Sequence, residues 1–222
     1  MKLAVVIAAL DEAERIEASV RSAHAPDVEV IVVDGGSRDA TVARARGAGA
    51  RVLETPPGRA RQLQAGARAS GGEAVVFLHA DTRLPPGYAA ALRAALADPR
   101  VAGGSFALRF DARSPGLRAI EWGAELRRRL LHLPYGDQAL FVRRRVLVAI
   151  GGVPDAPLME DLDLVRAVRR HGRLARLRLP VTSSARRYLA GGVLRTMLRN
   201  WTALAAWRLG IDRERVAAWY RR

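Results

Sequence analysis

Cysteine is absent from this sequence of 222 residues, and lysine occurs once, as Lys2. The absence of cysteine excludes disulfide bonds and thiolate metal sites. Aromatic residues make up 5% of the chain, which is few for a nucleic-acid-binding module, and no nucleic-acid-binding motif is recognisable. No apolar run approaches the ~20 residues that a membrane-spanning helix needs. We therefore expect neither a spanning helix nor a nucleic-acid partner.

Positive charge is abundant: the net charge is +15 at pH 7, carried almost wholly by arginine. Such an excess points to an anionic partner, either nucleic acid, a phosphorylated small molecule or an acidic membrane surface. Half of the residues are hydrophobic and 27% are charged, which is ordinary for a soluble globular protein. The length fits one domain, and we see no linker or internal repeat that would divide residues 1–222.

The N-terminus, MKLAVVIAALDEAER, has a short apolar run followed by acidic residues and no cleavage-site pattern of a signal peptide. It is more typical of a first β-strand. We expect a cytoplasmic protein, with peripheral contact at the inner face of the membrane as an additional location.

The first hundred residues alternate between valine-rich runs and segments with helical spacing. Strands are expected at 3–8, 28–33, 50–54 and 73–79, and helices at 11–23, 39–49 and 58–70. This alternation predicts an α/β fold with a Rossmann-like, mostly parallel sheet flanked by helices. Ligands of such sheets bind at the carboxyl ends of the strands.

The second half is less regular and is expected to be a mixed extension of the same sheet. Strands are expected at 101–110, 137–144 and 173–180, and helices at 115–133, 159–172, 191–210 and 212–220.

One candidate binding motif, VVDGGSRDAT, ends a predicted strand at Asp34 and continues through two glycines. Ser37 or Asp39 can cap the helix that begins near Thr41. Asp34 can accept hydrogen bonds from a base or a ribose, or it can simply hold an ordinary strand-to-helix turn.

A second motif, FLHADTRLPPG, places His79 and Asp81 at the end of another buried strand. A carboxylate there can hold a divalent metal against a diphosphate, because the phosphates complete the metal's shell. Asp81 is the predicted ligand. His79 can ligate the metal, contact phosphate, or be a core histidine satisfied by backbone.

A third motif, MEDLDL, crowds Glu160, Asp161 and Asp163 into the first turn of a predicted helix. Acidic residues there are favoured by the helix dipole alone. A carboxylate on a rigid helix start is also well placed to take a proton from an attacking hydroxyl.

Arginines follow two other predicted elements. GRARQLQAGA carries Arg59 and Arg61, and SSARRY carries Arg186 and Arg187. Each pair can clamp phosphate oxygens, or can be ordinary solvated surface charge.

These motifs, in this order, resemble a family-2 glycosyltransferase with the GT-A fold. VVIAALDEAERI resembles the family's opening strand, FLHADTRLP stands where its metal motif is usual, and MEDLDL resembles its acidic catalytic motif. GRARQLQAGARAS, YGDQALFVRR and SSARRY also resemble a bacterial subgroup of short soluble members. The resemblance implies one domain with a nucleotide-sugar-binding half at 1–100 and an acceptor-binding half at 101–222.

The resemblance also implies a role for each residue that matches a motif. Asp161 would be the general base, and Asp81 would hold Mn²⁺ or Mg²⁺ on the diphosphate, with His79 in place of the usual first aspartate. The nucleotide would be bound by Ala8, Glu12, Asp34, Arg61 and Asp81. Acceptor or phosphate contacts would come from Glu160, Asp137, Gln138, Arg186 and Arg187.

The implied reaction is a single displacement with inversion, in which an acceptor hydroxyl attacks a nucleotide sugar. Metal-dependent nucleotidyl transfer to a sugar phosphate and nucleic-acid binding through arginine are the alternatives. The acceptor is left open among a lipid, a saccharide and a small metabolite. The apolar stripe of residues 193–209, with its arginines, fits an anionic membrane surface, the core or a subunit contact in a homo-oligomer.

Overall fold

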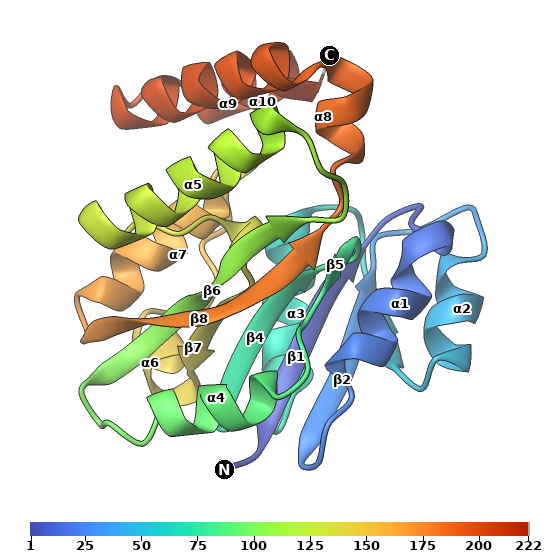
Figure 1. Cartoon of the computed structure of the whole chain (residues 1–222). Coiled ribbons are helices and arrows are strands. Elements are labelled where there is room, and N and C mark those ends of the chain that lie inside the picture. Colours follow the sequence, from blue (N-terminus) through green and yellow to red (C-terminus); the bar gives the residue numbers. More distant parts are fainter. Residues whose placement is uncertain (222) are drawn as a thin grey trace.

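The computed structural model describes residues 1–221. Strands and helices alternate along the first half of the chain and are more irregularly placed in the second (Figure 1). The strands are β1 (Leu3–Ala9), β2 (Val28–Asp34), β3 (Arg51–Glu54), β4 (Ala74–His79), β5 (Thr82–Arg83), β6 (Val101–Phe110), β7 (Leu140–Arg143) and β8 (Arg173–Ser183). The helices are α1 (Ala13–Ala23), α2 (Thr41–Gly47), α3 (Arg59–Ala69), α4 (Tyr88–Ala95), α5 (Pro115–Leu130), α6 (Arg144–Ala149), α7 (Glu160–Arg169), α8 (Arg186–Gly191), α9 (Val193–Arg208) and α10 (Arg213–Arg221), with a 3₁₀ turn at Gly136–Gln138.

The strands form one sheet of eight in the order β3-β2-β1-β4-β7-β6-β8-β5. β3, β2, β1 and β4 are parallel neighbours, so their carboxyl ends meet at one edge. These strands read as continuous apolar runs because helices cover both faces, and β1 is buried along nearly its whole length. The strand order reverses beside β1, which is where such sheets bind ligands.

The second half of the chain extends the sheet with mixed pairing. β7 pairs antiparallel with both β4 and β6, whereas β6 pairs parallel with β8. Gly103 and Gly104 allow this close packing, since a Cβ on Gly104 would lie 2.3 Å from the backbone oxygen of Ala175. The mixed extension therefore continues the parallel half of the sheet formed by β1–β4.

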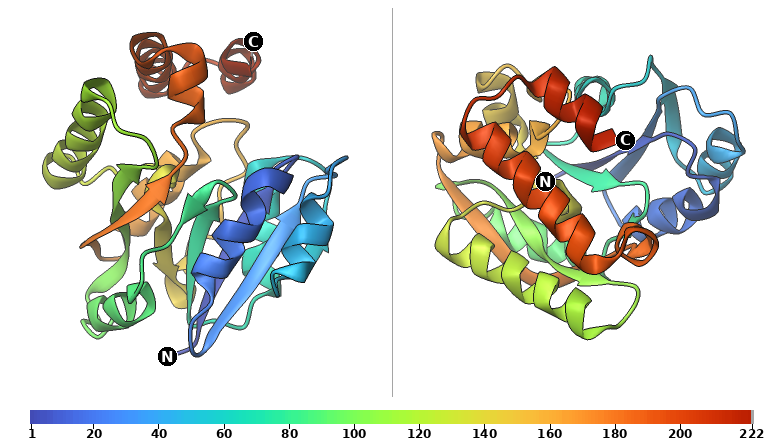
Figure 2. Two further views of the ribbon diagram at one scale, coloured as in Figure 1. Left: turned by 45° about the vertical axis from the view of Figure 1, so that its right-hand side comes forward. Right: turned by 90° about the horizontal axis from the view of Figure 1, so that it is seen from above.

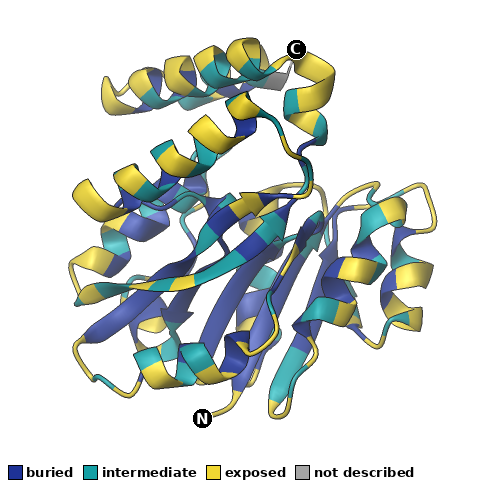
Figure 3. Cartoon of the chain, in the orientation of Figure 1, coloured by how far each residue is buried: buried dark blue, intermediate teal, exposed yellow. Residues whose placement is uncertain are grey.

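Apolar side chains are buried on both faces of the sheet (Figure 3). One cluster lies under α1 and α4 and contains Ile16 and Leu92, and the other lies under α3 and α7 and contains Leu63 and Leu162. A smaller cluster around Leu117 joins α5 to the start of α8.

The C-terminal helices α8, α9 and α10 lie beside α5 at the end of the molecule opposite the N-terminus (Figure 2). Asp163 of α7 fastens them: its Oδ1 accepts a 3.1 Å hydrogen bond from Trp207 Nε1, and its carboxylate pairs with Arg213. Arg166 lies 3.6 Å from the centre of the Trp207 ring. Across residues 1–221, each helix is too short or too polar to cross a membrane.

The structure confirms the α/β, mostly parallel architecture predicted from the sequence. Several short elements were not expected, including α4, α6, α8 and β5. Residues 137–139, expected to be strand, instead lie in the 3₁₀ turn and a left-handed residue, Ala139 (φ 45°). Turning the chain there places Asp137 at the edge of the sheet rather than within it.

Candidate active site

Three neighbouring strands bring the predicted N-terminal site residues to one edge of the sheet. The register pairs Ala8 of β1 with His79 of β4, and Ala9 of β1 with Asp34 of β2. Residues far apart in sequence therefore end their strands side by side. This edge is where the strand order reverses, and it is the natural place for a ligand.

Asp34 holds the turn that follows β2. Its Oδ2 accepts hydrogen bonds from the backbone N–H of Gly36 (2.9 Å) and of Ser37 (2.8 Å), and its Oδ1 accepts one from Ser37 Oγ. The carboxylate is buried, and Oδ1, which accepts one bond, retains a lone pair that a ligand's N–H or O–H can use. The N-cap residue of α2 is Ala40 rather than Ser37 or Asp39, although Asp39 Oδ1 accepts from Thr41 N at 2.9 Å just before the helix.

Gln62 of α3 ties the ends of the first two strands together. Its Nε2 donates to the backbone oxygens of Ala9 and Val33, each at 2.8 Å. The side chain is buried, and both acceptors lie next to the turn that follows Asp34. Gln62 was not among the residues predicted from the sequence. Its position on the apolar face of a predicted helix is the one feature that could have indicated a buried, hydrogen-bonded side chain.

His79 meets two residues from distant parts of the chain. Arg59 Nη2 donates to His79 Nε2, while Arg59 Nε lies 2.8 Å from Glu160 Oε1. Because arginine only donates, Nε2 is an acceptor and the ring is neutral. Burial, assisted by the positive charges of Arg59 and Arg187, lowers the pKa of His79 well below its usual value. Burial raises the pKa of Glu160 against the opposing influence of Arg59.

Asp161 completes this group from the first turn of α7. Its Oδ2 accepts a 2.6 Å hydrogen bond from the backbone N–H of Gly136, and its Oδ1 accepts from Leu162 N at 2.9 Å. A Cβ on Gly136 would lie 2.8 Å from Arg59 Nη2, 3.0 Å from His79 Nε2 and 3.2 Å from Asp161 Oδ2. Gly136 is thus the point at which the three side chains converge.

Asp137 follows Gly136 and carries an unsatisfied carboxylate. Its Oδ1 is buried and has no hydrogen-bond partner among the described residues. Burial raises the pKa of Asp137 to about 6, with Arg127 opposing the shift and Asp161 adding to it. A buried acceptor without a partner is costly, so a ligand hydroxyl placed there would relieve a penalty.

Asp81 lies beside a second group of charged side chains, Glu12 and Arg186, which come from the first and last thirds of the chain. Arg186, at the start of α8, pairs with Glu12 Oε1 and lies 3.5 Å from Asp81 Oδ2. Glu12 precedes α1, and its backbone N–H donates to Thr41 Oγ1 at 2.8 Å. The backbone oxygen of Asp81 accepts from Ser184 N at 3.1 Å, which holds the strand leading to α8 against the site.

The donor set at the end of β4 suits a divalent cation that a phosphorylated ligand helps to bind. Asp81 supplies a carboxylate, whereas His79, two residues earlier, has the lone pair of Nε2 occupied by the bond from Arg59 and could ligate the metal only after that bond is released. No cluster of three or more His, Asp or Glu among residues 1–221 forms a complete protein-only cage. Mg²⁺ and related ions on nucleotides typically take one or two carboxylates together with phosphate oxygens. The residues therefore fit a metal whose shell the ligand completes.

Three of the predicted residues do not join these groups through their polar atoms. Arg61 lies on the outer side of α3, where its Nε is 3.4 Å from Asp155 in an exposed ion pair. Gln138 is fully buried and is used internally, accepting from Tyr135 N at 3.1 Å. Arg187 donates to Tyr220 Oη at 3.2 Å. Arg59, rather than Arg61, is the arginine of α3 that reaches the site.

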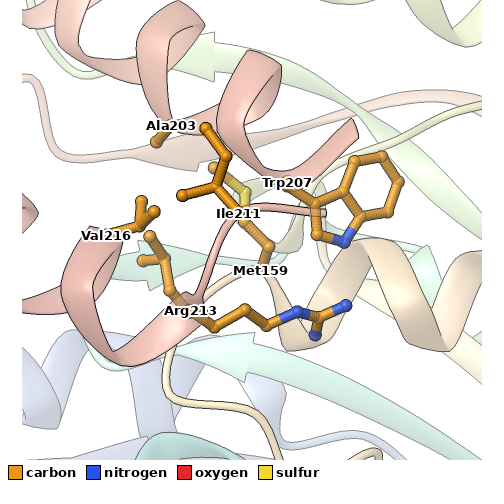
Figure 4. A pocket seen from close by; sticks show the side chains of 7 residues that line it. Met159, Ala203, Trp207, Ile211, Arg213 and Val216 are labelled. Carbon is orange, nitrogen blue, oxygen red and sulfur yellow. The ribbon is translucent and has the colours of Figure 1, made fainter. Parts of the chain in front are cut away.

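The C-terminal helices pack against Met159, the residue that immediately precedes α7. An apolar pocket lined by Leu158, Met159, Ala203, Trp207, Ile211, Arg213 and Val216 lies where α9 and α10 meet this loop (Figure 4). Met159 has a left-handed backbone (φ 62°), which is costly for a residue with a side chain. Packing of its side chain in this pocket fixes the turn that presents Glu160 and Asp161.

Solved structures of similar fold include nucleotide-dependent sugar transferases. A mannosyltransferase from Pyrobaculum calidifontis, in complex with GDP-Man and Mn²⁺, superposes with a TM-score of 0.67 at 22% identity, over 82% of this chain and 56% of its own. The glucosyl-3-phosphoglycerate synthase from Mycobacterium tuberculosis, in complex with Mn²⁺, UDP and glucosyl-3-phosphoglycerate, gives 0.65 at 23% identity, over 95% of this chain and 81% of its own. A mycobacterial protein at 28% identity gives 0.63, over 95% of this chain and 75% of its own.

A search of curated protein sequences finds no match for this chain. The sequence does match the family model described as glycosyl transferase family 2, over residues 4–151. That match covers more than half of the chain and includes Asp34, His79, Asp81 and Asp137. The chain therefore belongs to glycosyl transferase family 2.

Proposed function

We propose that this protein transfers a sugar from a nucleotide sugar to an acceptor hydroxyl in one displacement, with inversion at the anomeric carbon. Asp161 acts as the general base, and residues 1–100 bind the donor while residues 101–222 form the acceptor side of a single domain. The similar enzymes that hold GDP-Man or UDP with Mn²⁺ support a nucleotide-sugar donor.

One observation supports this proposal above the others: Asp161, His79 and Arg59 converge on Gly136 at the carboxyl edge of the sheet. A carboxylate, a neutral imidazole and a guanidinium thus surround one small residue beside Asp81. Because Asp161 is held by backbone N–H groups, its carboxylate is fixed before a substrate arrives. A fixed base within reach of an acceptor hydroxyl needs little reorganisation during proton transfer.

The proton balance of the step follows from this arrangement. The acceptor hydroxyl gives its proton to Asp161 as its oxygen bonds to the anomeric carbon, and the bond from that carbon to the diphosphate oxygen breaks. The nucleoside diphosphate leaves with the electron pair. No second carboxylate is required as a covalent nucleophile, in contrast with a retaining double displacement.

The leaving diphosphate requires positive charge near Asp81. A divalent metal held by Asp81 would neutralise the charge that develops on the departing oxygens, and His79 would join it through Nε2 once Arg59 donates to the diphosphate instead. Arg59 and Arg186 already lie at the two sides of this position and can donate to phosphate oxygens. Asp34 and Ala8 lie on the neighbouring strand ends, where the nucleoside would bind.

Asp137 is assigned to the sugar or acceptor side, because a carboxylate repels phosphate and binds hydroxyl groups. Its buried Oδ1 without a partner is a ready acceptor for one ligand hydroxyl. Glu160 is instead paired with Arg59 and serves to position that guanidinium.

A thermal-shift panel of nucleotide sugars, with and without Mn²⁺ or Mg²⁺, tests the proposal. Selective stabilisation by one nucleotide sugar, larger with metal, is expected, since a ligand that binds only the folded state raises its stability. Mass spectrometry of the nucleoside diphosphate released on incubation with acceptors then reports transfer. Stabilisation by nucleoside triphosphates with release of pyrophosphate would instead show nucleotidyl transfer and overturn the proposal.

A further inference from the structure

Large apolar side chains are exposed mainly at one end of the molecule. Of the large apolar residues that are exposed, only Met1, Leu10 and Val148 lie elsewhere in the described chain. The others belong to α5, to α8–α10 or to the connections that directly follow α5 and α9: Trp122, Leu126, Leu130, Leu131, Leu189, Leu194, Leu198, Trp201, Leu209, Ile211 and Trp219. Such concentration differs from the scattered single exposures of an ordinary surface.

The exposed residues form regular stripes on two helices. Trp122, Leu126 and Leu130 follow one another at four-residue spacing on α5. Leu194, Leu198 and Trp201 follow at spacings of four and three on α9, which keeps them on one side of that helix. These six residues are called the α5–α9 face. Trp122 is 69% exposed and Leu194 is 64% exposed, so the stripes are not covered by other parts of the chain.

The two helices belong to one surface. A Cβ on Gly116 would lie 2.9 Å from Val193 Cγ1, so the first turn of α5 packs against the first turn of α9. Figures 1 and 2 place α5 next to the C-terminal helices α9 and α10, at the end of the molecule opposite the N-terminus. The α5–α9 face thus consists of two exposed apolar stripes on helices whose first turns are in contact.

Helices α5 and α9 carry exposed arginines, and the acidic residues of α5 are paired within the protein. Helix α9 contains Arg195, Arg199 and Arg208 and no acidic residue. The two acidic residues of α5 are engaged within the protein: Glu121 accepts from Phe110 N at 2.7 Å, and Glu125 pairs with Arg128 at 2.6 Å. Arg118 and Arg129 of α5, and Arg195 and Arg208 of α9, are exposed.

From this surface we infer that the protein docks peripherally on an anionic lipid bilayer through the α5–α9 face. Exposed leucine and tryptophan side chains insert at the level of the headgroups, and the flanking arginines pair with lipid phosphates. A second copy of the chain fits less well, because a self-complementary contact would bring two arginine-rich faces together. The active-site side chain Arg186 opens α8, which leads directly into α9, so docking orients the site relative to the bilayer.

Co-sedimentation of the full chain with vesicles tests this inference. Vesicles of phosphatidylcholine alone are compared with vesicles that contain phosphatidylglycerol, at low and high salt. We expect binding to the anionic vesicles that weakens as salt rises. Equal binding to both kinds of vesicle, or binding to neither, would overturn the inference.

Two matched pairs of variants test the residues. Replacing Arg129 and Arg195 by Gln should weaken the apparent partition coefficient by about fivefold for each arginine, whereas replacing Arg21 and Arg68 on α1 and α3 should leave it unchanged. Leu194→Ser should weaken it further than Val148→Ser, although Val148 is 71% exposed. Circular dichroism and thermal melting establish that each variant is folded. Equal losses in the test and control variants would contradict docking through this face.

Tryptophan fluorescence separates a bilayer from a protein partner. Emission from variants that retain only Trp122 or only Trp201 should shift to shorter wavelength with anionic vesicles and remain unchanged on raising the protein concentration alone. A shift that depends on protein concentration without lipid, together with dimers in analytical ultracentrifugation that Leu194→Ser abolishes, would show that a second copy covers the face. These assays do not depend on sugar transfer, so they remain informative if the proposed reaction is wrong.

Discussion

The backbone N–H of Gly136 donates a 2.6 Å hydrogen bond to Oδ2 of Asp161, and so joins the 3₁₀ turn after α5 to the first turn of α7. This bond fixes a carboxylate that would otherwise rotate on an exposed helix start. It also leaves the far side of the carboxylate free, since within residues 1–221 the one other hydrogen bond to it is from Leu162 N to Oδ1. The predictions that concern chemistry depend on this contact.

Asp161→Asn should abolish transfer while leaving donor binding nearly unchanged. An amide of the same shape cannot take the proton of the acceptor hydroxyl, and loss of a general base typically costs about 10²–10⁴-fold in rate. Initial rates and calorimetric donor affinity measure the two effects. The matched control is Asp155→Asn, whose carboxylate is exposed and pairs with Arg61. Full activity in Asp161→Asn would remove this residue as the base.

Gly136→Ala should reduce activity strongly in a folded protein. The added methyl group would lie within 3.2 Å of Arg59, His79 and Asp161, so the group must spread apart. Gly123→Ala on α5 is the control, because nothing lies within 4 Å of a Cβ there. Steady-state kinetics and a thermal melt compare the two variants. Equal activity in both would show that the convergence at Gly136 is not used in the reaction.

Asp137→Asn should remove a pH dependence of stability. The pKa of Asp137 is raised from 3.8 to about 6, so between these values the native state holds a proton that the unfolded chain has released. The native protein therefore loses stability from this group as the pH rises through that range. The variant should lack this loss and be more stable above pH 6 by about 3 kcal/mol.

Urea unfolding at several pH values measures the effect of Asp137→Asn. Weaker donor or acceptor binding in the variant is expected alongside its greater stability, which is a usual exchange at functional sites. If native protein and variant show the same pH profile, Asp137 titrates normally and the unsatisfied carboxylate is not a significant penalty.

Asp163→Ala should loosen the C-terminal helices. It removes the acceptor for Trp207 Nε1 and the partner of Arg213, with an expected loss of about 1–3 kcal/mol in the free energy of unfolding. Asp155→Ala breaks only an exposed pair and should cost less than about 0.5 kcal/mol. Hydrogen exchange should be faster in α9 and α10. Unchanged exchange there would show that apolar packing alone holds these helices.

The parallel strands β1–β4 were predicted correctly from the sequence because the patterns that mark a strand and its end lie in neighbouring residues. Valine-rich runs ended by Asp34 and by His79 predicted where strands stop, and parallel pairing then brings those ends together. Arg59 and Arg61 could not be separated in this way. Which of two arginines on one helix faces the site depends on the rotation of α3 against the sheet, and the structure directs Arg59 inward to Glu160.

The structural role of Asp163 could not be predicted for a different reason. In sequence it is one of three carboxylates in a helix's first turn, and its residue type and spacing alone do not distinguish it from Asp161. In the folded chain it binds Trp207 and Arg213, which are far along the sequence, and it holds the C-terminal helices rather than a substrate. Its partners could not be read from residues 159–172 alone.

The sequence by itself determined the α/β class, the places where strands end in polar residues, and the acidic start of α7, because periodicity and short motifs are properties of neighbouring residues. Only the tertiary structure decided that Gly136 gathers Arg59, His79 and Asp161, that Gln138 is internal, and that α5 and α9 pack together while each leaves an apolar stripe exposed. These relationships join segments from different parts of the chain, and they are fixed by how helices rotate and pack against the sheet rather than by any local pattern.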